Sequence, residues 1–270
     1  MIRTLTDNDI PSALALCRNA GWNQLQTDWS RLLAYEPDGC FVADIDGQIV
    51  GTVTTTRYGT DLAWIGMMLV DDRFRRRGIA TALMNASLSY LRDCDVACIK
   101  LDATPLGQPV YERLGFQPDG SFHRWSRDGD ILPQWNPERP ANRLSPLNLQ
   151  LDRSAFSTDR RGWLNRLAAD SHVVSRNNCF GMARRGFLAN YLGPVIADNK
   201  QEAKQIVAEL LSQRSGQTFW DIPPGNSEAV RLAESFGFQP VRDLTRMRIG
   251  ATSVSPTMQF QFALSDPGTG

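Results

Sequence analysis

Arg75, Gly78 and Ala80, in the spacing Arg-x-x-Gly-x-Ala, form the part of this sequence best suited to hold a reactant. They follow residues 63–70 (AWIGMMLV), an apolar run with the length of a buried strand that is too short to span a membrane. A glycine at this point lets the backbone come close to a ligand, and a helix that begins there presents unpaired N–H groups and a positive dipole end. The chemistry favoured is pyrophosphate binding. The alternative is a solvated basic turn that contains a glycine by chance.

The residues after this loop are predicted to form an amphipathic helix. Apolar residues recur there at the spacing of one helix face, at Ala80, Leu83, Met84, Leu88 and Leu91. A pyrophosphate loop needs a strand before it and a helix after it, and the motif without that context often matches by chance. The context therefore favours the binding loop over the solvated turn.

This strand, loop and helix resemble the coenzyme A signature of the GNAT superfamily of N-acetyltransferases. Residues 101–116 (LDATPLGQPVYERLGF) extend the resemblance, because in the family a strand, a short helix with a tyrosine and a Gly-Phe turn follow the coenzyme site in that order. By this resemblance Tyr111, four residues before Gly115, is the general acid that protonates the leaving thiolate. A phenol, whose usual pKa is about 10, is protonated near pH 7 and can donate. The alternative for Tyr111 is a packed ring with a hydrogen-bonded tip.

The resemblance also implies how acetyl-CoA binds. In the family two central parallel strands splay apart and the pantetheine arm lies in the gap, where Met68 and Val70 would offer main-chain groups. The N–H groups of residues 76–80 would surround the pyrophosphate. The expected coenzyme-binding residues are Met68, Leu69, Val70, Arg75, Arg76, Arg77, Gly78, Ile79, Ala80 and Thr81. No metal ion is expected.

The general base is the missing part of the pattern. Many members of the family have a glutamate on the strand before the loop, and this sequence has Trp64 at the position aligned with it. Asp28, Glu36 and Asp61 are alternatives, acting directly or through water, whereas an amine that arrives neutral needs no base. We predict Asp28 as the catalytic carboxylate because it lies beside two tryptophans.

A tryptophan-rich stretch near the N-terminus is predicted to border the acceptor amine. It contains Trp22, Asn23, Asp28 and Trp29. Aromatic faces with a few polar groups can select an amine, and the alternative is that these indoles fill the core. Together with Trp64, these four are the expected substrate-binding residues.

Short strands and helices are predicted around these residues. Residues 40–44 and 48–57 alternate in polarity and flank Asp46-Gly47, a strong signal for a two-residue hairpin turn. With residues 63–70 they predict three antiparallel strands, and residues 96–102 predict a further buried strand. The expected fold class is α/β (α+β), with a mixed, mostly antiparallel central sheet flanked by helices.

The second half of the sequence repeats the first at the level of the fold. Residues 115–118 and 237–240 both read GFQP, and each tetrad follows a predicted strand and helix. Residues 197–202 (ADNKQE), at the place of the loop, contain no glycine and carry acidic side chains that would repel a phosphate. Ala233 stands where the first half has Tyr111. The copy is therefore expected to keep the fold and to lack the coenzyme site.

The order of both halves resembles the two-domain YitH-type acetyltransferases of the same superfamily, over nearly the whole chain. This resemblance implies tandem GNAT folds. We expect a catalytic domain that binds acetyl-CoA over residues 1–128, a proline-rich linker over 129–150 and a degenerate GNAT-like domain over 151–270.

The composition excludes several other classes of protein. The 29 basic Lys and Arg residues balance the 29 acidic residues, so the chain lacks the broad basic field of a nucleic-acid binder. No apolar stretch has transmembrane length, and the five cysteines and two histidines form neither a disulfide framework nor a metal site. We expect a cytoplasmic monomer or homodimer with no membrane or nucleic-acid partner.

The leading hypothesis is an acetyl-CoA-dependent N-acetyltransferase, in which a primary amine, expected to be that of a small molecule, attacks the thioester directly in a ternary complex. One alternative is acetylation of protein lysines or N-termini. Another is a coenzyme A-binding regulatory module without turnover. The presence of Arg75, Gly78 and Tyr111 favours the enzyme, and the missing glutamate favours the regulatory module. The acceptor and the preferred acyl chain stay open.

Overall fold

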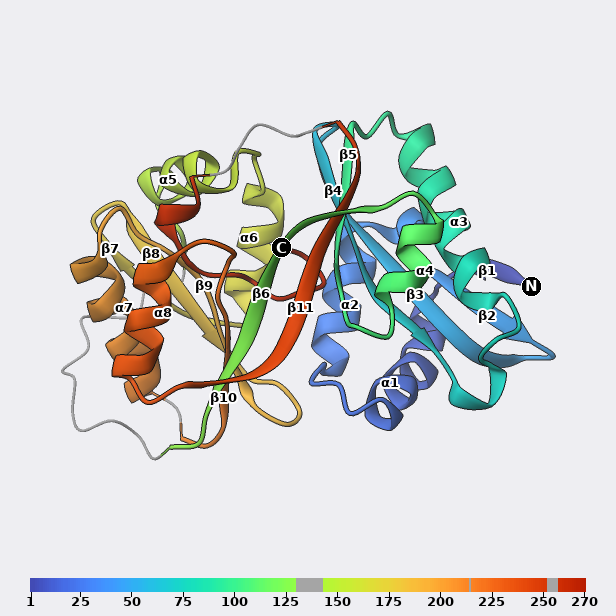
Figure 1. Ribbon diagram of the computed structural model, residues 1–270, viewed down its shortest axis with the longest axis horizontal. Coiled ribbons are helices and arrows are strands. Elements are labelled where there is room, and N and C mark those ends of the chain that lie inside the picture. The colour runs from blue at the N-terminus through green and yellow to red at the C-terminus, as the bar shows by residue number, and fades with distance from the viewer. Residues whose placement is uncertain (130–142, 214, 252–256) are drawn as a thin grey trace. The chain divides into compact units, whose positions relative to one another are not determined.

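The computed structural model describes residues 1–129, 143–213, 215–251 and 257–270, which divide into two units (Figure 1). The first unit contains Met1–Asp119, the end of strand β11 from Arg246 on, and Thr269. The second contains Gly120–Thr245 and most of the C-terminal segment. Each unit is thus built from separate parts of the sequence.

The first unit begins with two helices and a meander of strands. Its helices and strands in chain order are β1 (Ile2–Thr4), α1 (Ile10–Asn19), α2 (Gln26–Tyr35), β2 (Phe41–Ile45), β3 (Gln48–Tyr58), β4 (Leu62–Val70), α3 (Ile79–Asp93), β5 (Cys98–Ala103), α4 (Gln108–Arg113) and the start of β6 (Gln117–Arg127). Three short 3-10 turns, η1 (Asp7–Asp9), η2 (Pro37–Gly39) and η3 (Asp72–Phe74), lie between them.

The predicted hairpin is confirmed. Strands β2 and β3 pair in an antiparallel register that closes at Ile45 and Gln48. The two residues between them, Asp46 and Gly47, have φ of 53° and 82°. Positive φ at both central positions matches the twist of the flanking strands, and aspartate followed by glycine adopts it readily.

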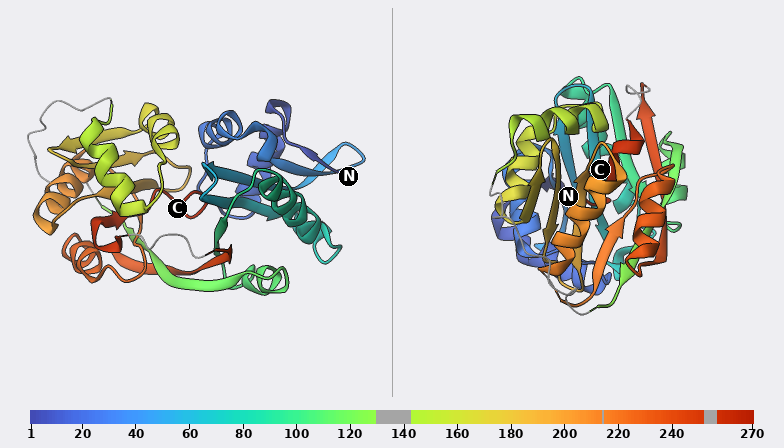
Figure 2. Two further views of the ribbon diagram at one scale, coloured as in Figure 1. Left: turned by 90° about the horizontal axis from the view of Figure 1, so that it is seen from above. Right: turned by 90° about the vertical axis from the view of Figure 1, so that its left-hand side faces the viewer.

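The sheet of the first unit has the strand order β1-β2-β3-β4-β5-β11-β6. The pairs from β1 to β4 are antiparallel, and β4 pairs with β5 in parallel. Helices α1 and α2 cover one face, and α3 and α4 cover the other (Figure 2, left view). The core under α3 buries the predicted stripe at Leu83, Met84, Leu88 and Leu91 against β3, β4 and β5.

The second unit repeats this order of elements. It contains α5 (Pro146–Phe156), α6 (Arg161–Ala169), β7 (His172–Arg176), β8 (Cys179–Arg184), β9 (Asn190–Ile196), α7 (Lys200–Ser212), β10 (Thr218–Asp221), α8 (Ser227–Ser235), the start of β11 (Gln239–Gly250), η4 (Met258–Phe260) and β12 (Gln261–Ala263). Its sheet has the order β11-β6-β10-β9-β8-β7, and β12 pairs with β9. One core lies under α7 and α8, and another lies under α5 and α6.

A strand from the other half of the sequence is inserted into each sheet and held by a buried ion pair. In the first unit Arg246 of β11 makes two hydrogen bonds to the Asp102 carboxylate of β5, at 2.9 and 3.0 Å. In the second unit Arg124 of β6 makes two to Asp221 of β10, at 2.8 and 2.7 Å. The same kind of pair thus occurs in both units. Each joins the inserted strand to its neighbour in the sheet through two charge-assisted hydrogen bonds.

The units do not coincide with the ranges expected from the sequence. Strands β6 and β11 each run from one unit into the other, so neither 1–128 nor 151–270 is a complete unit. Part of the linker expected over 129–150 is helical, because α5 begins at Pro146, where the Ser145 hydroxyl accepts from the Asn148 N–H. Proline is favoured in a first helical turn, so Pro146 starts a helix here. Residues 130–142 of that linker lie outside the described residues.

The described ranges lack two features of other protein classes. No helix in them is long and apolar enough to cross a bilayer. They also contain no group of three or more His, Cys, Asp or Glu side chains placed to hold a metal ion.

Candidate functional site

Strands β4 and β5 separate along their length. They pair at Leu62–Cys98, Ala63–Ile99 and Trp64–Lys100. Strand β4 continues to Val70, and β3 stays paired to its opposite edge as far as that residue. Along residues 65–70, the edge of β4 that faces β5 therefore has no strand partner within the described part of the chain. An extended chain with amide groups can pair with such an edge.

A bulge shapes the open part of β4. The β3–β4 register shifts between Thr52 and Thr54, and Met67 has a φ of 50°. The Thr52 hydroxyl donates to the Met67 carbonyl at 2.8 Å, which pins the bulge. Bulges re-aim backbone groups and occur beside active sites. Here the bulge lies next to Met68, which the resemblance expects to offer main-chain groups to the pantetheine arm.

The start of helix α3 supplies an anion site that continues from this edge. Gly78 is its N-cap with a φ of 80°, and no side chain caps the helix. A Cβ at Gly78 would have no heavy atom within 4 Å, so the space beside this residue is open. Four arginines and two aspartates occupy positions 71–77, which gives the loop a net positive charge. Uncapped N–H groups, the helix dipole and this charge together suit a pyrophosphate.

The loop arginines are held close to the surface. Arg75, more than half exposed, pairs with Asp72, and Arg73 pairs with Asp71. The Arg77 guanidinium lies 5.0 Å from the centre of the Phe74 ring. These contacts leave the charges beside the start of α3, where a ligand can reach them.

Tyr111 lies on α4 with a half-buried side chain. Its ring packs edge-on against Phe116 at 6.2 Å, and a Cβ at Gly107 would lie only 3.0 Å from its Cε2. Burial raises the pKa of Tyr111 to about 12. The hydroxyl makes no hydrogen bond to any residue of the described ranges. The ring packs against Phe116, so the general-acid role and the packed-ring alternative both stay predictions. A protonated phenol with an unused O–H can serve as a general acid.

Asp28 has structural partners. One carboxylate oxygen accepts the Leu25 N–H at 2.8 Å, which caps α2, and the other pairs with Arg31 at 2.9 Å. The side chain is buried. Asp28 as a general base stays a prediction, with both oxygens engaged in holding the start of α2.

The other carboxylates considered from the sequence lie elsewhere. Glu36 is buried, accepts from the Tyr90 hydroxyl and pairs with Arg57 at 3.4 Å. Asp61 is exposed at the paired end of β4 and β5, away from the open end. Neither lies on the open stretch of β4.

The aromatic residues expected around the acceptor divide into different environments. Trp29 is 0% exposed, so in this structure its ring belongs to the core, contrary to the expected role in substrate binding. Asn23 is buried as well, and Trp22 is half-buried. Because Trp22 is partly exposed whereas Trp29 and Asn23 are buried, a ligand can contact the Trp22 ring. For Trp29, this burial favours the alternative that the indole fills the core.

Trp64 has a cationic neighbour that the sequence did not indicate. Its ring is 1% exposed, and the Arg246 guanidinium lies 4.5 Å from its centre. Arg246 lies 144 positions from its partner Asp102, and no local pattern links them. The one signal in the sequence is that Lys100 and Asp102 interrupt an otherwise apolar strand.

Comparisons with known proteins agree with this geometry. A model described as Acetyltransferase (GNAT) family matches residues 9–116, and another described as Acetyltransferase (GNAT) domain matches residues 149–263. The chain is 26% identical over 242 residues to the uncharacterized N-acetyltransferase YitH of Bacillus subtilis, which covers 86% of this chain and 84% of that protein.

Solved structures share the tandem fold. A putative acetyltransferase from Pyrococcus horikoshii superposes with a TM-score of 0.88 at 24% identity, covering 100% of this chain and 95% of that one. A tandem GNAT protein from the clavulanic acid biosynthesis pathway superposes with a TM-score of 0.67 at 15% identity, covering 94% and 99%. At these identities the likeness concerns the fold.

Proposed function

Since this chain belongs to the GNAT family of acetyltransferases, with a match to the family in each half, we propose that it transfers an acetyl group from acetyl-CoA to a primary amine at the first unit. The observation that carries the proposal is one continuous surface. The unpaired edge of β4 leads into a loop and a helix start that no side chain caps.

The residues of this surface fit the parts of acetyl-CoA in order. Main-chain groups of Met68 and Val70 would face the open edge and pair with the pantetheine arm, and Leu69 lies between them. The helix start from Gly78 and the basic residues before it suit the pyrophosphate. The proposed coenzyme-binding residues are the ten predicted from the sequence, at positions 68–70 and 75–81.

Tyr111 is proposed as the general acid. The amine nitrogen attacks the thioester carbonyl carbon in a ternary complex, the carbon–sulfur bond breaks, and the leaving thiolate takes the phenolic proton. The amine nitrogen gives its proton to a base or to solvent. With its pKa raised to about 12 by burial, Tyr111 is protonated at neutral pH and has a proton to donate.

The proposed acceptor is the amine of a small molecule, and Trp22 is the residue best placed on the α1–α2 connection to contact it. Acetylation of a protein lysine or N-terminus is the second candidate. With tryptophan at the position of the family glutamate, Trp64 supplies no base, so an amine that reaches the site neutral is the favoured nucleophile.

Two measurements test the proposal. Calorimetric titration with acetyl-CoA should give one site per chain. Thiol release should then be followed with small primary amines, lysine peptides and peptides with free N-termini, and small amines are expected to give the highest kcat/KM. Faster turnover of a peptide class would replace the proposed acceptor. Tight binding with no thiol release from any amine would favour the regulatory module, and two equivalent sites would contradict the assignment of the coenzyme to one unit.

A further inference from the structure

The second unit has the same opening between parallel strands as the first. Strands β9 and β10 pair at Asn190–Thr218, Tyr191–Phe219 and Leu192–Trp220 and then separate. Strand β8 stays paired to the opposite edge of β9, at Gly181–Val195 and Phe180–Ile196. A register shift between Gly181 and Ala183 places a bulge in β9, as in β4. The edge of β9 beyond Leu192 therefore corresponds to the open edge of β4.

In this unit the edge carries a strand of the chain itself. Strand β12 pairs antiparallel with β9 at Val195–Ala263 and Ile196–Gln261. The Ala197 N–H donates to the Phe260 carbonyl at 3.0 Å, and the Leu264 N–H donates to the Asp221 carbonyl of β10 at 2.9 Å. Since β8 takes the other edge of β9, β12 lies on the edge that faces β10 and fills the opening between the two strands.

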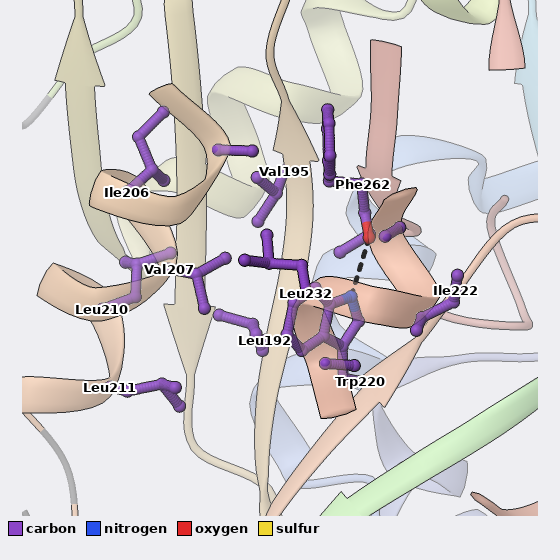
Figure 3. Packing of buried hydrophobic residues seen from close by; sticks show 14 of the residues in the cluster. Leu192, Val195, Ile206, Val207, Leu210, Leu211, Trp220, Ile222, Leu232 and Phe262 are labelled. Carbon is purple, nitrogen blue, oxygen red and sulfur yellow. Dashed lines mark hydrogen bonds between the residues drawn. The ribbon is translucent and has the colours of Figure 1, made fainter. Parts of the chain in front are cut away.

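Side chains around the opening hold the main chain of this segment. The Trp220 indole N–H donates to the Phe262 carbonyl at 2.7 Å, shown as the dashed line in Figure 3. The Asn226 side-chain amide donates to the Gln261 carbonyl at 2.8 Å, and the Gln261 amide donates to the Ala155 carbonyl at 2.7 Å. Phe262 and Leu264 are 1% and 2% exposed. The segment is therefore bound through its backbone and buried through its side chains.

The close approach of the segment depends on a glycine. A Cβ at Gly193 of β9 would lie 1.9 Å from the Leu264 carbonyl oxygen, which is closer than a real Cβ atom can approach. Gly193 also has a φ of 146°, which side-chain-bearing residues rarely adopt. Close backbone approach to a bound chain is a recurring use of glycine in strands.

The helix beside this opening is not arranged for a phosphate. Asn199 caps α7 by accepting the Glu202 N–H at 2.9 Å, and Asp198 precedes it. The Asn199 side chain therefore already occupies an N–H group that an anion would need. The negative charge of Asp198 would repel the anion.

We propose that the opening of the second unit is a binding site for an extended peptide, and that residues 260–264 of the same chain are its occupant. The edge of β9 beyond Leu192 can pair with the amide groups of an extended chain, and β12 uses it in this way. Recognition follows the β-augmentation mode, with main-chain bonds for affinity and side chains in flanking pockets. This inference concerns the second unit and does not rest on the activity proposed for the first.

Peptide exchange tests the proposal on the complete chain. A protease site is placed between positions 251 and 257, the purified protein is cleaved there, and a fluorescent peptide of residues 257–270 is added in excess. We expect the cleaved segment to stay bound on gel filtration and the labelled peptide to exchange into its place. A matched peptide methylated on the Leu264 amide nitrogen cannot donate to Asp221 and should compete about tenfold less well. Equal competition by both peptides, or no uptake of the labelled peptide, would overturn the proposal.

Gly193→Ala gives a second, independent test in the cleaved protein. It should release the segment, because the added methyl meets the Leu264 carbonyl. Gly225→Ala is the control, since Gly225 also has a positive φ, of 82°, and a Cβ there meets nothing within 4 Å. Equal retention of the segment by both variants would contradict the proposal. If Gly193→Ala does not fold, as judged by circular dichroism, the peptide exchange decides.

Discussion

Strands β4 and β9 leave their parallel neighbours in the same way and end in different surroundings. Each pairs with its neighbour over three residues, carries a bulge and stays paired to a strand on the other edge. Beyond that point β9 is covered by β12, whereas β4 has no strand partner in the described ranges. The splayed strands themselves are common to both units, and what lies along the open edge distinguishes them.

The helices that follow these strands differ in their first residue. Gly78 begins α3 with a left-handed backbone and no capping side chain, so the helix N–H groups stay available to an anion. Asn199 begins α7 and accepts one of those N–H groups with its own side chain. One residue at the N-cap therefore separates a helix start that can bind a phosphate from one that is already satisfied.

The largest expected effect comes from filling the open helix start. Gly78→Glu places a carboxylate where the pyrophosphate would bind, so repulsion and a side chain at a positive φ should abolish acetyl-CoA binding. Calorimetric titration measures this loss. Gly47→Glu is the matched control, because Gly47 has a φ of 82° and open space around its Cβ but lies in the β2–β3 turn. Unchanged affinity in Gly78→Glu would place the coenzyme elsewhere.

The second prediction concerns the ion pairs that both units share. Arg246→Met leaves the buried Asp102 carboxylate without its bidentate partner and should lower the free energy of unfolding by about 3–5 kcal/mol. Arg124→Met should do the same for Asp221. Urea unfolding followed by circular dichroism measures both. A loss of turnover in Arg246→Met with an unchanged free energy of unfolding would show that this pair serves the reaction. The two ion pairs would then have different roles in the two units.

The third prediction concerns Tyr111, the proposed general acid, which has Ala233 as its counterpart in the second unit. Tyr111→Phe removes the proton donor while keeping the ring, so kcat should fall about a hundredfold with little change in acetyl-CoA affinity. Because the pKa of Tyr111 is raised to about 12, the phenol stays protonated below that pH, and its ionisation should cause no fall in kcat between about pH 8 and 10. Steady-state kinetics across pH check both statements. Full activity of Tyr111→Phe would leave Tyr111 as a packing residue.

The smallest effect is expected from the cap of the second unit. Asn199→Ala should lower the free energy of unfolding by about 1 kcal/mol, as loss of a helix cap does. It should not create a second acetyl-CoA site, because β12 still covers β9. Ser145→Ala, which removes the cap of α5, is a control of similar size at a helix that does not follow β9 in the chain. A second calorimetric site in Asn199→Ala would mean that the cap alone excludes the coenzyme.

Local features of this protein could be predicted because their causes lie within a few residues. Asp46 and Gly47 make the β2–β3 turn by their own backbone preferences, and the stripe from Leu83 to Leu91 forms α3 by its period. The strand, the Gly78 turn and the helix of the proposed coenzyme loop belong to this class, since they follow one another directly. The repeat of the fold in the second half could be recognised for the same reason.

Only the tertiary structure decided which distant segments meet. Arg246 reaches Asp102 across 144 positions, and nothing in β11 specifies which sheet will receive its end. The burial of Trp29 depends on what packs over it, so the sequence alone left its role open between substrate contact and core. Strand β12 is three residues long and carries too little pattern to predict a partner. Turns and helix starts follow from local conformational preferences, whereas strand pairing depends on neighbours that the chain brings together when it folds.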